Sequence, residues 1–170
     1  MYTLDAAIDQ LLTARRTVRA YSDQPLETEK LEAVVEAGRR APFAGLVNRE
    51  VPAFRRFYVV KRGSKTAESL KALVVAFRAE ELQRAREGNW AEKYPPEVAN
   101  VEVLLGTADD RFPAETLVVV AERAGRPVRE EATLGTVIEN MWLKAGALDL
   151  GFTFRSVVGD ITDKAAMKAL

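Results

Sequence analysis

The sequence of 170 residues contains neither cysteine nor histidine. Without cysteine, disulfides, thiolate nucleophiles and sulfur-ligated zinc sites are excluded. Without histidine, the chain has no Ser-His-Asp or Cys-His machinery, and it lacks the commonest acid or base at neutral pH. If this chain is an enzyme, we expect a cofactor to supply the difficult chemistry.

The chain also lacks an excess of either charge and any long hydrophobic run. Its 25 lysines and arginines balance 25 acidic residues, whereas nucleic-acid-binding proteins usually carry a basic excess. No stretch approaches the roughly 18 uninterrupted apolar residues of a membrane span. The start, MYTLDAAIDQ, does not look like a signal peptide. We therefore expect one cytoplasmic globular domain over residues 1–170, with no nucleic-acid or membrane partner.

Apolar residues recur at helical spacing along five stretches of the chain. Thr28 is predicted to cap the second helix, and Gly151 to provide a left-handed C-cap after the fourth. The second and fourth helices are the best candidates for the core. The first expected helix ends at about residue 15, and the second covers about 28–40. The third ends at about residue 86, and the fourth covers about 134–148. The fifth begins at about residue 162.

Aromatic and β-branched runs predict three strands between these helices, over residues 54–61, 115–122 and 152–158. Residues 88–113 are rich in glycine and proline and predict a long irregular loop, which in a compact domain is often functional. The alternation of helices and strands predicts a layered arrangement of both.

Three arginines lie close together at the end of the first predicted helix, in ARRTVRAYSDQPL (14–26). One interpretation is a solvated helix end, where basic residues favour the negative end of the helix dipole. The other is a binding site for a small anion such as phosphate, since arginine binds phosphate bidentately and a hydroxyl adds a donor. In an extended segment, Arg15, Thr17 and Arg19 would share one face.

Other candidate motifs are weaker. Neither GTADDRF nor GRRAPFAG has the spacing of a glycine-rich phosphate loop. The acidic pairs Asp109-Asp110 and Glu130-Glu131 are more simply explained by loop solvation and a negatively charged helix start than by metal ligation. We therefore predict no metal site.

Two longer stretches resemble the nitroreductase family of flavin mononucleotide (FMN) enzymes. They are ARRTVRAYSDQPLETEKLEAVVEAGRRAPFAG (14–45), similar to the family's opening, and EATLGTVIENMWLKAGALDLG (131–151), similar to its central helix. The resemblance implies an α+β sandwich in which helices cover a mixed β-sheet. It also implies an intimate homodimer, with FMN in each cleft between the chains.

The resemblance further implies roles for particular residues, all of them in cofactor binding and none as a catalytic acid or base. Arginines would hold the FMN phosphate and ribityl chain, with Thr17 at the family's serine position. The proline loop would pack on the flavin bound mainly by the partner chain, and a later pair would lie near the isoalloxazine ring. The phosphate and ribityl group consists of Arg15, Arg16, Thr17 and Arg19. The proline loop contributes Pro42, Phe43 and Ala44. The pair near the isoalloxazine ring is Arg155 and Ser156.

The sequence departs from the family pattern in four places. Phe43 stands where a small hydroxyl residue is usual, and it would either stack near the ring or fill space. Residues 46–50 and 154–157 also differ from the usual motifs. Finally, the sequence stops at KAAMKAL, where members continue with a strand and a basic tail. Two explanations stay open: the sequence is a piece of a longer chain, or the protein is a minimal member that lacks this element.

The resemblance implies an NAD(P)H-dependent flavin oxidoreductase. It would reduce a nitroaromatic, a quinone or a similar electron-poor acceptor by a ping-pong mechanism. Two alternatives stay open: other flavin chemistry on the same scaffold, such as flavin fragmentation or dehalogenation, and a non-enzymatic dimer that has lost the cofactor.

Overall fold

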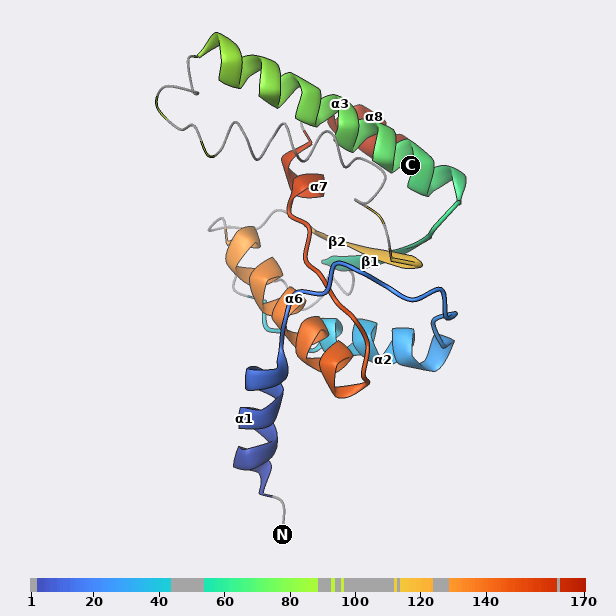
Figure 1. The fold of residues 1–170 in the computed structure, drawn as a ribbon, viewed down its shortest axis with the longest axis vertical. Coiled ribbons are helices and arrows are strands. Elements are labelled where there is room, and N and C mark those ends of the chain that lie inside the picture. Colours follow the sequence, from blue (N-terminus) through green and yellow to red (C-terminus); the bar gives the residue numbers. More distant parts are fainter. Residues whose placement is uncertain are drawn as a thin grey trace. The chain divides into compact units, whose positions relative to one another are not determined.

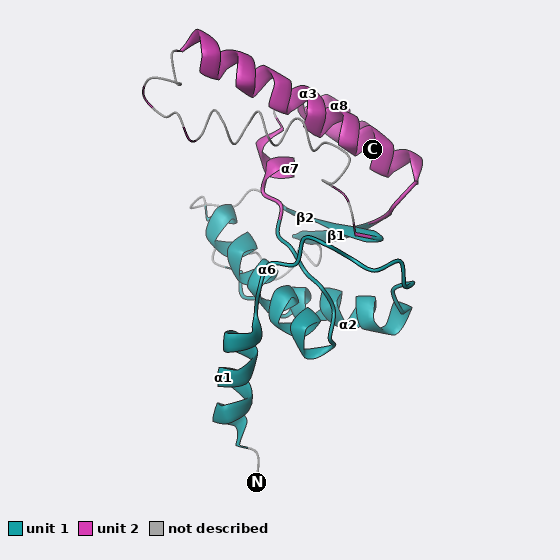
Figure 2. Cartoon of the chain, in the orientation of Figure 1, with its two compact units in different colours: residues 1–59, 115–154 teal, residues 60–114, 155–170 magenta. Residues whose placement is uncertain are grey.

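The structure is a computed structural model that describes residues 3–43, 54–88, 93, 96, 112, 114–123, 129–161 and 163–170. It divides into two compact units, each built from two separate stretches of chain (Figure 2). The first comprises residues 1–59 and 115–154, and the second comprises residues 60–114 and 155–170. The single domain predicted over residues 1–170 stays a prediction.

Helices dominate the described part of both units (Figure 1). The first unit holds α1 (Leu4–Ala14), α2 (Thr28–Arg39), β2 (Thr116–Glu122), α6 (Glu130–Ala147) and most of β1 (Arg55–Lys61). The second holds α3 (Lys65–Glu87), α7 (Val157–Asp160) and α8 (Lys164–Ala169). Among the described helices, none is long and apolar enough to cross a membrane.

The core of the first unit lies where α2 packs on α6. Gly38 permits this close approach, because a Cβ there would lie only 2.9 Å from Met141 Cγ and from Phe57 Cε1. The prediction that the second and fourth helices form the core is therefore confirmed. The buried cluster consists of Val34, Ala41, Val137, Met141 and Ala145, with Phe57, Val118, Val120, Leu148, Leu150 and Phe152 packed against it.

The two strands form a small antiparallel sheet. The backbone N–H of Arg123 donates to the carbonyl of Phe54 at 2.7 Å, which joins the end of β2 to the start of β1. Both strands were predicted within one residue of their observed bounds. A mixed sheet of more strands is not seen in the part of the chain that the structure describes.

The third predicted strand is wrong. Residues 152–155 have no regular secondary structure, and Val157 begins α7. The carbonyl of Phe152 accepts one backbone hydrogen bond, from Val18 at 3.0 Å, but the segment around Val18 is not a strand. Aromatic and β-branched residues suit any half-buried surface, so the pattern alone could not show that a ladder of partners was missing.

Two helix ends also differ from expectation. Glu27 is the N-cap of α2, and Thr28 is its first helical residue. After α6, the left-handed residue is Asp149, with φ 56°, rather than Gly151. Gly151 serves close packing instead, because a Cβ there would lie 2.9 Å from Val18 Cγ1.

In the second unit, a glycine turn and a serine cap define the start of α3. Gly63 adopts φ 76° in the turn after β1, and the Ser64 side chain then caps α3 by accepting from the N–H of Ala67 at 3.1 Å. The apolar face predicted for this helix includes the buried Leu70 and Val74.

Candidate functional site

The arginine segment, residues 15–19, begins where α1 ends. Arg15 is the C-cap of α1 and is already extended, with φ −60° and ψ 122°, and the last turn of α1 holds no basic residue. Thr17 and Arg19 are exposed, whereas Val18 between them is half-buried. Arg15 and Arg16 are exposed as well, so Val18 is the one residue of the segment that is half-buried. The anion site stays a prediction.

Backbone contacts attach the arginine segment to distant parts of the first unit. The carbonyl of Arg16 accepts from Trp142 Nε1 at 3.2 Å. The N–H of Val18 donates to the carbonyl of Phe152 at 3.0 Å, and the hydroxyl of Tyr21 donates to the carbonyl of Val18 at 2.9 Å. The segment is therefore held in place although its cationic side chains are exposed.

The three arginines differ in how far they are already engaged. Arg15 lies over the Trp142 ring, with Cζ 4.6 Å from the centroid, and its Nε is 3.8 Å from Glu139 Oε1. Arg16 and Arg19 are exposed and form no ion pair with any described residue. Arg16 and Arg19 are thus available to an anion, and Arg15 is in addition oriented by its contacts with α6.

Pro42 and Phe43, in the second predicted group, lie just after α2. Phe43 packs on Phe54, with ring centroids 4.5 Å apart and ring planes inclined by 56°. Through this contact Phe43 fills space beside the start of β1. Pro42 is exposed, and Ala44 lies outside the described residues.

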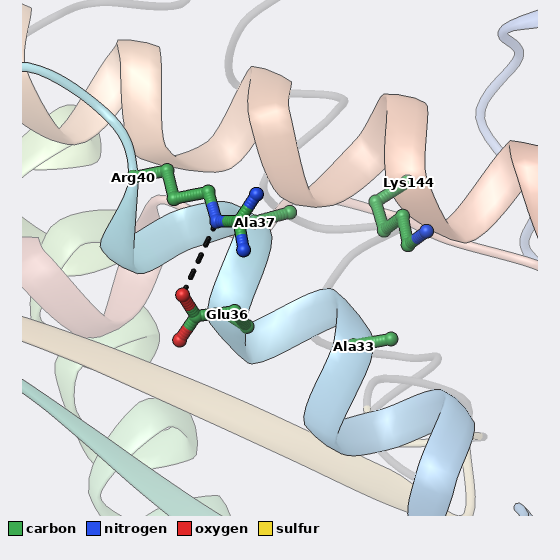
Figure 3. Close-up of a pocket in the computed structure, with 5 residues that line it drawn as sticks. All are labelled: Ala33, Glu36, Ala37, Arg40 and Lys144. Carbon is green, nitrogen blue, oxygen red and sulfur yellow. Dashed lines mark hydrogen bonds and ion pairs between the residues drawn. The ribbon is translucent and has the colours of Figure 1, made fainter.

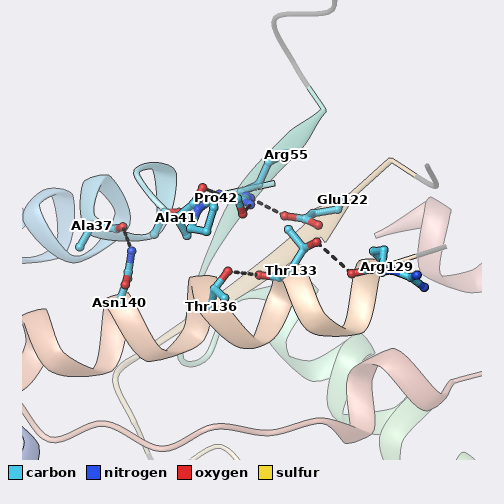
Figure 4. A network of polar contacts seen from close by, with 10 residues as sticks. Ala37, Ala41, Pro42, Arg55, Glu122, Arg129, Thr133, Thr136 and Asn140 are labelled. Carbon is cyan, nitrogen blue, oxygen red and sulfur yellow. Dashed lines mark hydrogen bonds and ion pairs between the residues drawn. The ribbon is translucent and has the colours of Figure 1, made fainter. Parts of the chain in front are cut away.

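Arg55 connects this loop to the sheet (Figure 4). Its guanidinium donates to the carbonyls of Gly38 at 2.9 Å, Ala41 at 3.0 Å and Pro42 at 3.2 Å. It also pairs with the Glu122 carboxylate, and the two side chains are only 4% and 0% exposed. The Arg55 clamp, meaning Arg55 with these four partners, satisfies carbonyls at the end of α2 and holds the start of the loop.

Arg155 and Ser156 form the third predicted group. Arg155 is half-buried, and the exposed Ser156 precedes α7. Both belong to the second unit. The arginine segment and the described start of the proline loop belong to the first unit.

An open pocket of about 250 Å³ lies beside α2 and α6 (Figure 3). Arg40 in this pocket pairs with Glu36 at 3.2 Å, one helical turn away. The lining includes none of the predicted site residues; it consists of Ala33, Glu36, Ala37, Arg40 and Lys144. Asn140 donates to the carbonyl of Ala37 at 3.3 Å (Figure 4). No cluster able to hold a metal ion occurs among the described side chains.

Sequence reasoning missed the residues that support the site, chiefly Arg55, Glu122 and Trp142. Trp142 packs against Phe152 and also contacts Arg15 and Arg16. The signal for Arg55 was a charged residue within the strand motif FRRFYVVK. A buried cation needs a partner, but the motif does not say which one.

The family model of the nitroreductase family matches residues 12–169. The chain belongs to this family, which confirms the resemblance seen in the sequence. The match supports a flavin oxidoreductase in general. No curated protein matches the sequence.

Solved structures resemble the chain in fold. A nitroreductase with bound FMN from Bacteroides fragilis is 21% identical with a TM-score of 0.61, over 95% of this chain and 76% of that one. A predicted nitroreductase in complex with FMN from Desulfovibrio desulfuricans is 19% identical with a TM-score of 0.64, over 98% and 77%. A BluB-like flavoprotein from Clostridium difficile is 18% identical with a TM-score of 0.51, over 95% and 80%.

Proposed function

We propose that this chain is an FMN-dependent oxidoreductase that uses NAD(P)H to reduce an electron-poor acceptor such as a nitroaromatic or a quinone. The observation that carries the proposal is the arginine segment, a held backbone with exposed Arg16 and Arg19 that pair with no acidic side chain among the described residues. Family membership and the FMN complexes of two structural neighbours support it.

The chemistry of these residues fits the phosphate end of FMN. Guanidinium groups form charge-assisted, bidentate hydrogen bonds with phosphate, and the exposed Thr17 hydroxyl between them adds a neutral donor. The Arg55 clamp holds Pro42, at the start of the loop that is proposed to pack on the flavin. When bound, FMN would take two electrons from NAD(P)H and then pass them to the acceptor, in a ping-pong sequence. The absence of histidine and cysteine is then no obstacle.

The first test is the colour of the freshly purified chain. We expect visible flavin absorbance and one FMN per chain, either as isolated or after addition of FMN and removal of the excess. NAD(P)H should bleach that absorbance, and a nitroaromatic or a quinone should restore it. Colourless protein that does not take up added FMN would contradict the proposal and favour a non-enzymatic protein that has lost the cofactor.

A second candidate is other flavin chemistry on this scaffold, such as fragmentation. It is favoured by Phe43, whose ring occupies a position where the family usually has a small hydroxyl residue. Product analysis of reduced FMN with oxygen separates the two candidates. Recovery of intact oxidised FMN would exclude fragmentation.

We further propose that the chain acts as a homodimer. The support is α1, which has no buried residue and exposes Leu4 (79%), Ile8 (48%) and Leu12 (52%) at intervals of one helical turn. Such a stripe is typical of a helix whose apolar face packs on another surface.

Replacing Ile8 and Leu12 by glutamate should therefore shift the protein from dimer to monomer in sedimentation experiments. Charged side chains would be costly to bury in an apolar interface. Glutamate at Ala6 and Thr13, two exposed and uncharged positions on the other face of α1, adds the same charge and should leave the mass unchanged. A wild-type chain that sediments as a monomer would refute the dimer.

A further inference from the structure

Trp142 on α6 contacts two consecutive residues of the arginine segment in different ways. Its indole N–H donates to the backbone carbonyl of Arg16 at 3.2 Å. Its ring lies under the guanidinium of Arg15, with Cζ 4.6 Å from the centroid. One side chain thus holds both the backbone of the segment and the direction of one of its cationic groups.

Phe152 extends this support. Its ring centroid is 5.5 Å from that of Trp142, with the planes inclined by 31°. The carbonyl of the same residue accepts the N–H of Val18 at 3.0 Å. The aromatic pair is therefore tied to Arg15, Arg16 and Val18, which are nearly consecutive in the chain.

We propose that Trp142 is a positioning residue for the phosphate site, an inference that rests on the proposed function. Long, exposed arginine side chains lose rotamer freedom when they bind a ligand, and prior ordering reduces that cost. Trp142 orders Arg15 by a cation–π contact and orders the neighbouring peptide by a hydrogen bond. Leucine at this position would fill part of the volume but make neither contact.

Titration of apo-protein with FMN and with riboflavin, which lacks the phosphate, tests this role. We expect Trp142→Leu to raise the Kd for FMN about tenfold, with little change for riboflavin, because the two lost contacts serve the phosphate end. Trp142→Phe keeps an aromatic face but has no N–H donor, and should recover part of the affinity for FMN. If the substitution only destabilised the fold in general, it would weaken the binding of FMN and of riboflavin equally.

Tyr58→Leu is the matched control, since Tyr58 is an aromatic residue of the first unit that is 48% exposed. It should leave the preference for FMN over riboflavin unchanged. If the wild type and Trp142→Leu prefer FMN over riboflavin to the same extent, Trp142 has no positioning role. The proposed function is not affected by that result. If the wild type binds neither ligand, or binds both equally, the proposed phosphate site itself is wrong.

Discussion

Replacing Arg55 by leucine is expected to lower the free energy of unfolding by about 3–5 kcal/mol, because it leaves a buried carboxylate without its counterion. Glu122 is fully buried, and in the described structure its Oε2 already has no hydrogen-bond partner. The substitution also removes three donors from the carbonyls of Gly38, Ala41 and Pro42. Urea unfolding followed by circular dichroism measures the change.

The neighbouring Arg56 provides the control for this experiment. It lies on the same strand but is exposed, so Arg56→Leu should change stability by less than about 0.5 kcal/mol. A combined Arg55→Leu, Glu122→Leu variant should recover part of the loss, since no charge is then left buried alone. Equal stability of the Arg55 and Arg56 variants would show that the clamp contributes nothing.

The Arg55 substitution should also weaken FMN binding if the proline loop forms part of the flavin site. Arg55 contacts Pro42 directly, and it lies over Phe54, with Cζ 5.3 Å from the ring centroid. Phe54 in turn packs on Phe43. Loss of the clamp would free the start of the loop from β1, so both stability and affinity depend on one side chain.

Replacing Arg15 and Arg19 together by alanine is expected to raise the Kd for FMN a hundredfold or more. Charge-assisted hydrogen bonds are worth roughly 1.5–3 kcal/mol each, and about 1.4 kcal/mol corresponds to a tenfold change. Fluorescence titration of the apo-protein measures the affinity. Because phosphate binding is electrostatic, added salt should weaken the wild type more than the variant.

A second double variant removes the same charge elsewhere in the first unit. Arg39 and Arg56 are both exposed, and replacing them by alanine should leave the FMN affinity nearly unchanged. If the Arg15, Arg19 variant instead binds FMN as the wild type does, the assignment of the phosphate site is wrong, even for a protein that binds flavin.

Local patterns were sufficient for the five predicted helices and for two of the three predicted strands among the described residues. The periodicity of α2 and α6, with an inward face at Val34 and Val137, predicted both helices and the core between them. The strand at 152–158 failed because a strand exists only with a partner beside it. The apolar residues there are held by one backbone bond to Val18 and by packing.

The amino-acid sequence alone determined the family, the helices and the arginine segment, because each is written in neighbouring residues with regular spacing. Only the tertiary structure decided how that segment and the proline loop are held. Trp142 donates to Arg16 across 126 positions, and Arg55 pairs with Glu122 across 67. Such contacts depend on which surfaces pack against each other when the chain folds. A local sequence pattern does not show which residue will pair with a buried charge or with an indole N–H.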